Sequence, residues 1–265
     1  MDLGKPDGST STFSSFIGDP NGDPDDYIFD STVLCSLNEL SSSLYPSYPF
    51  DPPLPPGFPP FPVQPCHDYL HHITSFEALR PRWRWLLVGR KGAGFGMHVD
   101  PHATCAWNTL LAGKKRWALL PPSTPSELAS PDPSTPARLW FEHQLPVLLS
   151  KGLKPVQLEQ YPGETIFIPS GWWHVALTVS ENFSVAVTCN FMDKKSFEEQ
   201  VAILFAKSPD AAASWVKRVI EAGLPFHLQS SLANKLIGIY RVEGAPAADF
   251  LQAACTKEED KPLNF

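Results

Sequence analysis

The feature that most constrains this fold is a succession of short β-type segments between residues 82 and 191. Runs of β-branched and aromatic residues alternate there with turns that contain Gly and Pro. Strands are predicted over residues 82–89, 94–100, 106–113, 115–122, 156–161, 164–169, 172–179 and 183–191. Many short strands without helices between them are typical of a β-sandwich or barrel, so the predicted fold class is mainly β.

Two connections in this region carry specific expectations. We expect the segments 106–113 and 115–122 to pair as a hairpin with Gly113 and Lys114 at its tip. Residues 123–155 are rich in Ser and Pro, and we expect them to form a long irregular connection.

The segments before and after the β region have different compositions. Residues 1–26 are rich in Gly, Ser, Asp and Pro and are expected to be irregular, with a short strand following at 27–30. Residues 45–66 contain ten prolines, which neither a helix nor a central strand tolerates. An extended connector around the core is the favoured interpretation, and a ligand for an SH3 or WW domain is the alternative.

Helical periodicity appears after residue 191. Amphipathic helices are predicted over residues 193–208, 209–223, 230–244 and 245–255, with a further short helix at 67–79. The predicted organisation is therefore an acidic, proline-rich N-terminal segment (1–66), a β domain (67–191) and a C-terminal α-helical appendage (192–265).

Charge and cysteine usage limit the classes of partner and compartment. Residues 1–66 carry nine acids and one base, whereas residues 67–265 carry 20 bases and 19 acids. A nearly neutral body makes direct nucleic-acid binding an unfavoured function, while the acidic lead could attract a basic peptide. The five cysteines form no CxxC pair, which indicates a reduced compartment. No apolar run of 18 residues predicts a membrane span, and the first residues lack the apolar region of a secretory signal.

A metal site is predicted from two of the β segments. His98 and Asp100 are two residues apart, and residues two apart on a strand point to the same face. His174, on a later predicted strand, supplies a third ligand of the type that completes a His₂–carboxylate triad for non-haem Fe(II). Taken singly, each of these residues could be an ordinary turn or core residue without a metal. The prediction of a metal site depends on the three converging at one end of a sandwich.

Polar residues on neighbouring segments suggest a cosubstrate. Such a triad leaves metal positions open for a bidentate 2-oxo acid, and 2-oxoglutarate would present its distal carboxylate to a cation. Lys115 is the candidate cation, because strand alternation should place one of Lys114 and Lys115 inside and the other in water. Asn108, Thr188 and Asn190 could add hydrogen bonds.

The combined motifs resemble a known family. HVDP, AWN, KRW, PGET and GWWH occur in order between residues 98 and 174. Their sequence context is similar to that of the JmjC (Jumonji C) Fe(II)/2-oxoglutarate oxygenases, closest to the bifunctional arginine demethylase and lysyl-hydroxylase (phosphatidylserine-receptor-like) subgroup. The resemblance covers residues 27 to 191, with gaps over the proline-rich segment. It implies a double-stranded β-helix, a cupin-like jelly roll.

The resemblance also implies the roles of individual residues. Iron ligation is implied for His98, Asp100 and His174. Cosubstrate contacts are implied for the following residues: Asn108, Lys115, Thr188, Asn190 and Tyr27. One position departs from the subgroup, because Phe95 stands where a threonine helps to hold 2-oxoglutarate.

By resemblance, the expected activity is a dioxygenase that hydroxylates lysine or demethylates arginine in proteins. Fe(II) is the implied cofactor, and 2-oxoglutarate and O₂ are the implied cosubstrates. A protein or peptide with Lys or Arg, such as a histone tail or an RNA-processing protein, is the implied partner. A nuclear or cytoplasmic location and a homodimer through the C-terminal helices are further expectations. Action on a small molecule or RNA, a catalytically weak binding module and a purely structural cupin stay open as alternatives.

Overall fold

The computed structural model describes residues 2–5, 8–19, 22–30, 69, 84–221, 223, 224, 226, 228 and 232–237. The chain divides into two compact units: residues 1–62 with 82–190, and residues 63–81 with 191–265. The predicted proline-rich connector at 45–66, the helix at 245–255 and the helix at 67–79, apart from Tyr69, lie outside the described residues. The three-part division made from the sequence therefore stays a prediction.

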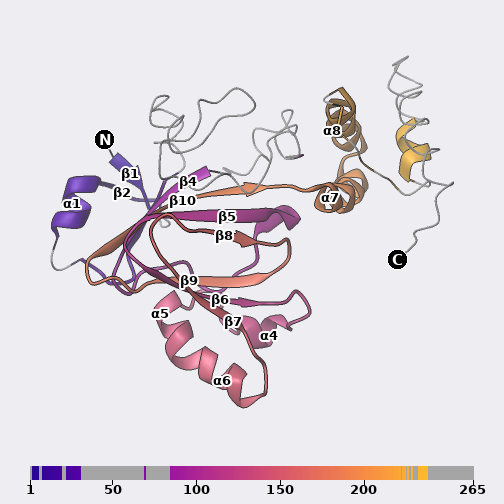
Figure 1. The fold of residues 1–265 in the computed structure, drawn as a ribbon. Helices are drawn as coiled ribbons and strands as arrows, with labels where there is room; N and C mark the ends of the chain where they lie inside the picture. Colours follow the sequence, from indigo (N-terminus) through magenta and orange to yellow (C-terminus); the bar gives the residue numbers. More distant parts are fainter. Residues whose placement is uncertain are drawn as a thin grey trace. The chain divides into compact units, whose positions relative to one another are not determined.

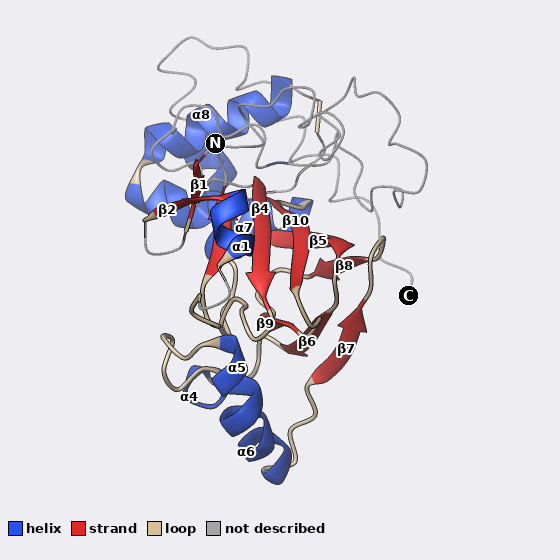
Figure 2. Ribbon diagram, turned by 90° about the vertical axis from the view of Figure 1, so that its left-hand side faces the viewer, coloured by secondary structure: helices blue, strands red, loops and turns tan. Residues whose placement is uncertain are grey.

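Two sheets stack face to face in the first unit (Figures 1 and 2). The order in the larger sheet is β3 (Tyr27–Asp30), β4 (Arg84–Arg90), β10 (Phe183–Phe191), β5 (Cys105–Ala112) and β8 (Thr165–Ile168). The order in the smaller sheet is β7 (Val156–Gln160), β6 (Lys115–Leu120) and β9 (Trp173–Thr178). The mainly β fold class and the short strand at 27–30 are thus confirmed.

The predicted hairpin of residues 106–122 is wrong. β5 lies in the larger sheet beside β10 and β8, whereas β6 lies in the smaller sheet beside β7 and β9. Gly113 and Lys114 therefore connect two sheets. A short link that contains Gly can form a hairpin within one sheet or connect two sheets. Only the pairing of β5 and β6 with distant strands distinguishes these two arrangements.

Gly113 is tightly confined at this connection. Its φ is +84°, and an added Cβ would lie 2.4 Å from the carbonyl oxygen of Phe183. Gly152 has a similar φ of +80° but no atom within 4 Å of an added Cβ. We expect Gly152→Ala to cost about 1 kcal/mol through left-handed strain alone, and Gly113→Ala to cost clearly more, on the order of 3 kcal/mol, because backbone must also move. Urea denaturation of both variants measures the difference, and equal losses would contradict it.

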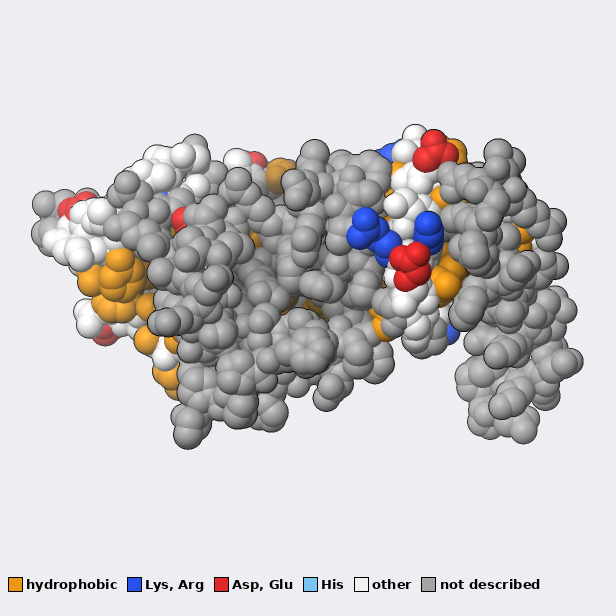
Figure 3. Space-filling model, turned by 90° about the horizontal axis from the view of Figure 1, so that it is seen from above, with side chains coloured by type: hydrophobic (Ala, Val, Ile, Leu, Met, Phe, Trp, Pro, Cys, Tyr) orange, Lys and Arg blue, Asp and Glu red, His pale blue; other side chains and the backbone are white. Residues whose placement is uncertain are grey.

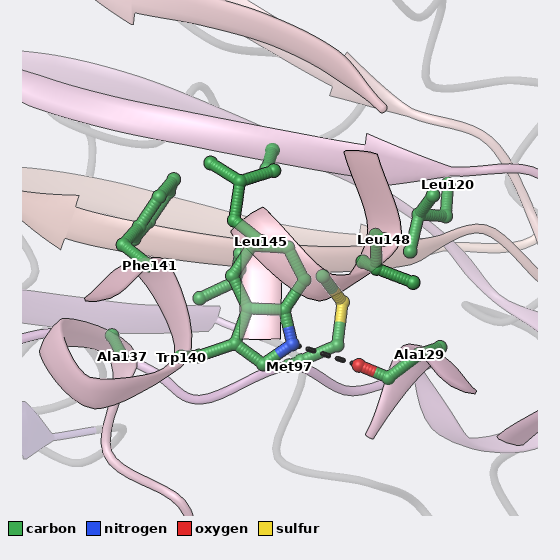
Figure 4. Close-up of a cluster of buried hydrophobic side chains, with 10 residues drawn as sticks. Met97, Leu120, Ala129, Ala137, Trp140, Phe141, Leu145 and Leu148 are labelled. Carbon is green, nitrogen blue, oxygen red and sulfur yellow. Dashed lines mark hydrogen bonds between the residues drawn. The ribbon is translucent and has the colours of Figure 1, made fainter. Parts of the chain in front are cut away.

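The region 123–155 is helical, contrary to the expected irregular connection. It contains α4 (Ser126–Ala129), α5 (Ala137–Leu139), the π-helical turn η4 (Trp140–Gln144) and α6 (Leu145–Ser150). Figure 4 shows buried side chains of these helices packed with Met97 and with Leu120 of β6, and the indole of Trp140 donates a 2.7 Å hydrogen bond to the Ala129 carbonyl. Burial of apolar side chains on the outer face of the smaller sheet stabilises these short helices despite the Ser and Pro content.

The first residues are also more ordered than their composition predicts. β1 (Asp2–Gly4) pairs with β2 (Thr10–Thr12), and α1 (Phe13–Gly18) follows, with Thr12 capping its first turn through a 3.1 Å bond from the Ser15 N–H. Phe16 is buried, and its carbonyl accepts a hydrogen bond from Arg90 at the end of β4. Contacts with the sheet therefore order a segment that lacks a strong local signal.

The second unit is described mainly by two helices, α7 (Lys194–Lys207) and α8 (Pro209–Glu221), and both were predicted. Residues 232–237 are helical as well, within the predicted helix at 230–244. The Phe197 ring lies 4.9 Å from both the Tyr69 and the Trp215 rings, and the Trp215 indole donates to the Tyr69 carbonyl. Among the helices that the structure describes, none has the length and apolar character needed to cross a membrane.

Candidate metal centre

His98 and His174 pair through their backbones as an isolated antiparallel β-bridge. The backbone N–H of His98 donates to the His174 carbonyl at 3.0 Å, and the backbone N–H of His174 donates to the His98 carbonyl at 2.9 Å. The strand predicted at 94–100 is otherwise absent, so that expectation is corrected. Pro101 has no N–H and directly follows Asp100, so it cannot continue a ladder of backbone hydrogen bonds beyond this point.

Three side chains converge at the bridge. The Nε2 atoms of His98 and His174 lie 3.8 Å and 3.9 Å from the same carboxylate oxygen of Asp100. One ligand atom from each residue lies within 4.8 Å of those of the other two. The structure therefore brings together the three residues that the sequence proposed as a triad.

Backbone carbonyls fix the orientation of both imidazoles. Nδ1 of His98 lies 2.7 Å from the Gly96 carbonyl oxygen, and Nδ1 of His174 lies 3.0 Å from the Trp172 carbonyl oxygen. A carbonyl only accepts hydrogen bonds, so each Nδ1 carries the proton and each Nε2 keeps a lone pair. Both lone pairs belong to the atoms that face Asp100.

Burial keeps these imidazoles neutral. The pKa of each imidazole is lowered to about 4, mainly by burial, and repulsion by His174 contributes to the lowering at His98. The pKa of Asp100 is raised by burial, while His98 and a hydrogen bond from Asn190 oppose that rise. Neutral imidazoles beside a carboxylate are the protonation states that a divalent metal requires of such ligands.

The turn after Asp100 is held in an unusual conformation. In the 3-10 turn η3 (Pro101–Ala103), φ is +57° at His102 and +51° at Ala103, a region that non-glycine residues seldom adopt. The Thr104 hydroxyl donates to the Pro101 carbonyl at 2.9 Å and accepts from the Asn190 amide at 2.8 Å. Asn190 thereby fixes the turn that presents Asp100, a positioning role that the sequence did not suggest.

The residues fit a metal ion. Two Nε2 lone pairs and a carboxylate meet at one point, and the second carboxylate oxygen of Asp100, Oδ2, is buried without a hydrogen-bond partner among the described residues. An unpaired buried carboxylate oxygen is costly unless a cation compensates it. A His₂–carboxylate set without cysteine is the donor set of non-haem Fe(II). His98, Asp100 and His174 would hold the ion.

Strand register places Lys115 inside the sandwich. Lys115 lies opposite Thr178 in the smaller sheet, and the Thr178 hydroxyl lies 2.7 Å from that of Ser184 in the larger sheet. The side chains of Thr178 and Ser184 therefore meet between the sheets, and Lys115 shares their face. Lys115 is 7% exposed, and burial lowers its pKa to about 8.

The neighbouring Lys114 points the other way, as strand alternation predicted. Its ammonium lies 2.8 Å from the Glu159 carboxylate and 5.0 Å from the centre of the Tyr161 ring. The prediction that one of the two lysines lies inside and the other in water is confirmed.

The remaining predicted contacts lie on the inner faces too. Asn108 is 2% exposed, and its Oδ1 has no hydrogen-bond partner among the described residues. The Thr188 hydroxyl donates to the Trp107 carbonyl at 2.7 Å, which leaves its oxygen lone pairs as acceptors. Tyr27 lies opposite Gly89, where an added Cβ would approach Thr178, so the Tyr27 side chain shares the inner face. Burial raises the Tyr27 pKa, which keeps the phenol neutral.

Gln160 is a buried residue that the sequence did not single out. Its amide oxygen accepts from the Trp117 indole at 2.9 Å, and its amide nitrogen donates to the Asn108 carbonyl at 2.9 Å. Gln160 therefore joins the two sheets behind Asn108. Alternation in the segment 156–161 would have placed its side chain inward, but the sequence alone gave no partner for it.

Comparison with known proteins agrees with this geometry. Residues 85–191 match the family model described as JmjC domain, hydroxylase. The match begins at the second residue of β4 and includes all later strands of the two sheets, so only β3 lies outside it. All three triad residues lie within the match. The resemblance drawn from the motifs is confirmed.

Several relatives carry the same region. The bifunctional arginine demethylase and lysyl-hydroxylase psr-1 of Caenorhabditis elegans is 36% identical over 164 residues, which are 58% of this chain and 40% of that protein. The lysine-specific demethylase JMJ21 of Arabidopsis thaliana is 41% identical over 143 residues, 49% of this chain and 15% of that protein. The 2-oxoglutarate and iron-dependent oxygenase JMJD4 of Mus musculus is 29% identical over 127 residues, 44% and 30% respectively. The chain thus spans less than half the length of these relatives.

Proposed function

The chain carries a JmjC domain at residues 85–191, and from this premise we propose that it is an Fe(II)- and 2-oxoglutarate-dependent dioxygenase acting on protein side chains. The observation that carries the proposal is the convergence of His98, Asp100 and His174 in a sandwich that also buries Lys115. No carboxylate of the described residues pairs with the Lys115 ammonium, and a buried ammonium is costly unless it receives an anion. The distal carboxylate of 2-oxoglutarate is such an anion.

Each component has a distinct task in this proposal. Fe(II), when bound with 2-oxoglutarate, supplies the activation of O₂ that C–H hydroxylation requires. The triad residues hold the ion with both imidazoles fixed by backbone carbonyls. Lys115 receives the distal carboxylate, and Asn108 and Thr188 add hydrogen bonds to the cosubstrate. Buried apolar residues that the two sheets share exclude water from this interior.

The proposed substrates are lysine and arginine side chains in proteins. Hydroxylation of a lysine C–H bond gives a stable alcohol, whereas hydroxylation of an N-methyl group on arginine gives a product that loses formaldehyde. The relatives named for arginine demethylation and lysyl hydroxylation support a protein substrate. A histone tail is the specific candidate, and a nuclear or cytoplasmic location belongs to the same proposal.

The exposed charges of α8 do not form a basic patch that would favour a nucleic acid (Figure 3). Figure 3 shows Lys and Arg side chains beside Asp and Glu side chains over the position of α8, whose exposed charged residues are Asp210, Lys217, Arg218 and Glu221. Interspersed charges of both signs do not create the basic field that phosphate recognition requires. The proposal also includes a homodimer through the C-terminal helices, and light scattering of the full chain would test it.

The direct test is succinate formation from 2-oxoglutarate with added Fe(II), with and without lysine- and arginine-rich peptides that include histone tails. Peptide-stimulated succinate with a peptide mass increase of one oxygen, or the loss of one methyl group, would establish the enzyme and identify its reaction. No peptide modification despite metal and 2-oxoglutarate binding would favour a catalytically weak binding module. Phe95, in place of the subgroup threonine, is the observation that favours this second function.

The pKa of Lys115 predicts a pH dependence of cosubstrate binding. Because burial lowers this pKa to about 8, the free protein loses the ammonium as the pH rises through 8. We expect the KM for 2-oxoglutarate to be constant below about pH 8 and to rise about tenfold per pH unit above it, since binding then requires proton uptake. Lys115→Arg should remove this rise, because a guanidinium stays charged. A wild-type KM that is flat up to pH 9.5 would contradict the assignment.

A further inference from the structure

Four aromatic side chains form a continuous cluster that ends at the metal centre. We call Tyr27, Phe29, Trp85 and Phe95 the aromatic cluster. The Phe29 and Trp85 rings are stacked at 5.3 Å, and the Phe95 ring lies 5.4 Å from Phe29 and 5.8 Å from Tyr27. The Phe95 ring also lies 4.5 Å from the His98 ring, so the cluster extends to a triad residue.

The backbone around Phe95 is confined on both sides. An added Cβ at Gly94 would lie 1.9 Å from the Ala176 carbonyl oxygen, and one at Gly96 would lie 2.6 Å from the Thr135 carbonyl oxygen. Both glycines are therefore required by close approach of neighbouring backbone. The backbone on both sides of Phe95 is thereby confined, while the residue itself is 37% exposed. A partly exposed aromatic ring next to a triad residue can contact a substrate.

The Phe95 ring is not stacked flat against its aromatic neighbours, and the residue is partly exposed. The Phe95 plane is inclined by 54° to that of Phe29 and by 64° to that of Tyr27, so the rings form a corner rather than a flat stack. The face of an aromatic ring attracts a positive charge within about 6 Å of its centre. No purely apolar ligand gains from this electrostatic attraction.

The charge of the N-terminal segment that leads into β3 also favours a cation. β3, which contributes Tyr27 and Phe29, ends the segment of residues 1–30, and that segment contains seven Asp and one Lys. Two of these acids are paired, Asp26 with Lys5 and Asp25 with Arg138, whereas Asp23 is exposed. The segment adjoining the cluster is therefore net negative, complementary to a basic peptide.

We propose that Phe95 is a specificity-determining residue that holds the positively charged end of the substrate side chain against the aromatic cluster. This inference rests on the proposed function for the existence of a protein substrate and adds the means by which the side chain is selected.

Equilibrium binding tests this role without turnover. The full chain with Mn(II) and 2-oxoglutarate is titrated by calorimetry with three peptides that differ at one position: arginine, citrulline, which has nearly the same shape without the charge, and norleucine. We expect arginine to bind best. Phe95→Leu should weaken arginine binding about threefold to fivefold and leave citrulline unchanged, whereas Phe95→Tyr should retain the preference.

Two controls separate this role from a structural one. Phe167→Leu, at a ring that is also exposed but lies on β8, should not alter arginine binding, and the melting temperatures of all variants verify folding. Equal weakening of arginine and citrulline by Phe95→Leu, or no wild-type preference for arginine over citrulline, would overturn the inference. Failure of the proposed function would appear separately, as absent succinate formation with Fe(II) while the arginine preference persists.

Discussion

Alanine in place of His98 or Asp100 is expected to reduce 2-oxoglutarate turnover to below about one thousandth of the wild-type rate, since loss of a ligand removes several kcal/mol of metal-dependent stabilisation. Each substitution leaves only two of the three converging ligand atoms. Succinate formation and the metal content after dialysis against Fe(II) measure the effect. Unchanged turnover in either variant would refute the ligand assignment.

The fold should survive these substitutions. The Asp100 carboxylate is buried and its Oδ2 lacks a hydrogen-bond partner among the described residues, so its removal eliminates a costly group in the metal-free protein. We expect the metal-free melting temperature of Asp100→Ala to equal or exceed that of the wild type. His102→Ala is the matched control, because this nearby imidazole is exposed and outside the triad. A similar loss of turnover in His102→Ala would indicate a disrupted turn instead of a lost ligand.

Substitution of Lys115 by methionine is expected to raise the KM for 2-oxoglutarate about 30-fold to 1,000-fold, which corresponds to roughly 2–4 kcal/mol. The reason is that the distal carboxylate of 2-oxoglutarate would then be buried without the ammonium that compensates its charge. Methionine retains most of the apolar stem and removes the ammonium. Because burial disfavours that ammonium in the free protein, the melting temperature without cosubstrate should not fall. The titration of succinate formation against 2-oxoglutarate gives the KM.

Lys114 provides the internal control for this experiment. It is the adjacent residue, its charge is the same, and its ammonium pairs with Glu159 at the surface. Lys114→Met should change the KM less than twofold, since exposed ion pairs contribute little. A KM that rises in Lys114→Met and not in Lys115→Met would reverse the assignment of the two lysines.

Local patterns predicted most elements of the fold. The segment 183–191 was predicted as a strand and is β10, and the segments 193–208 and 209–223 contain α7 and α8. β10 and α8 have a clear hydrophobic period, and α7 begins at a capping residue, Asp193, so local preference and tertiary environment agree in these elements. The errors fall where tertiary contacts dominate, as in the short helices of 123–155, which owe their stability to burial against the smaller sheet.

Strand pairing was the principal feature that local patterns did not predict. β5 and β6 adjoin in the sequence and yet belong to different sheets, because each pairs with distant strands. Paired residues of β6 and β7 are 37 to 45 positions apart, and those of β5 and β8 are 56 to 62 positions apart. The strand partners are set by contacts between distant segments, and a two-residue link does not encode them.

For the candidate site, the sequence by itself determined the chemical identity of the groups: the His-x-Asp pair, the later His174, and a lysine at position 115 that strand alternation allows to face inward. Residue type and spacing are local properties, so they can be recognised without coordinates. Only the tertiary structure decided that these groups converge within 4.8 Å, that Asn190 fixes the turn after Asp100, and that Phe95 joins three other aromatic rings beside His98. Those relations join segments far apart in the chain, and they exist only once the two sheets have closed on each other.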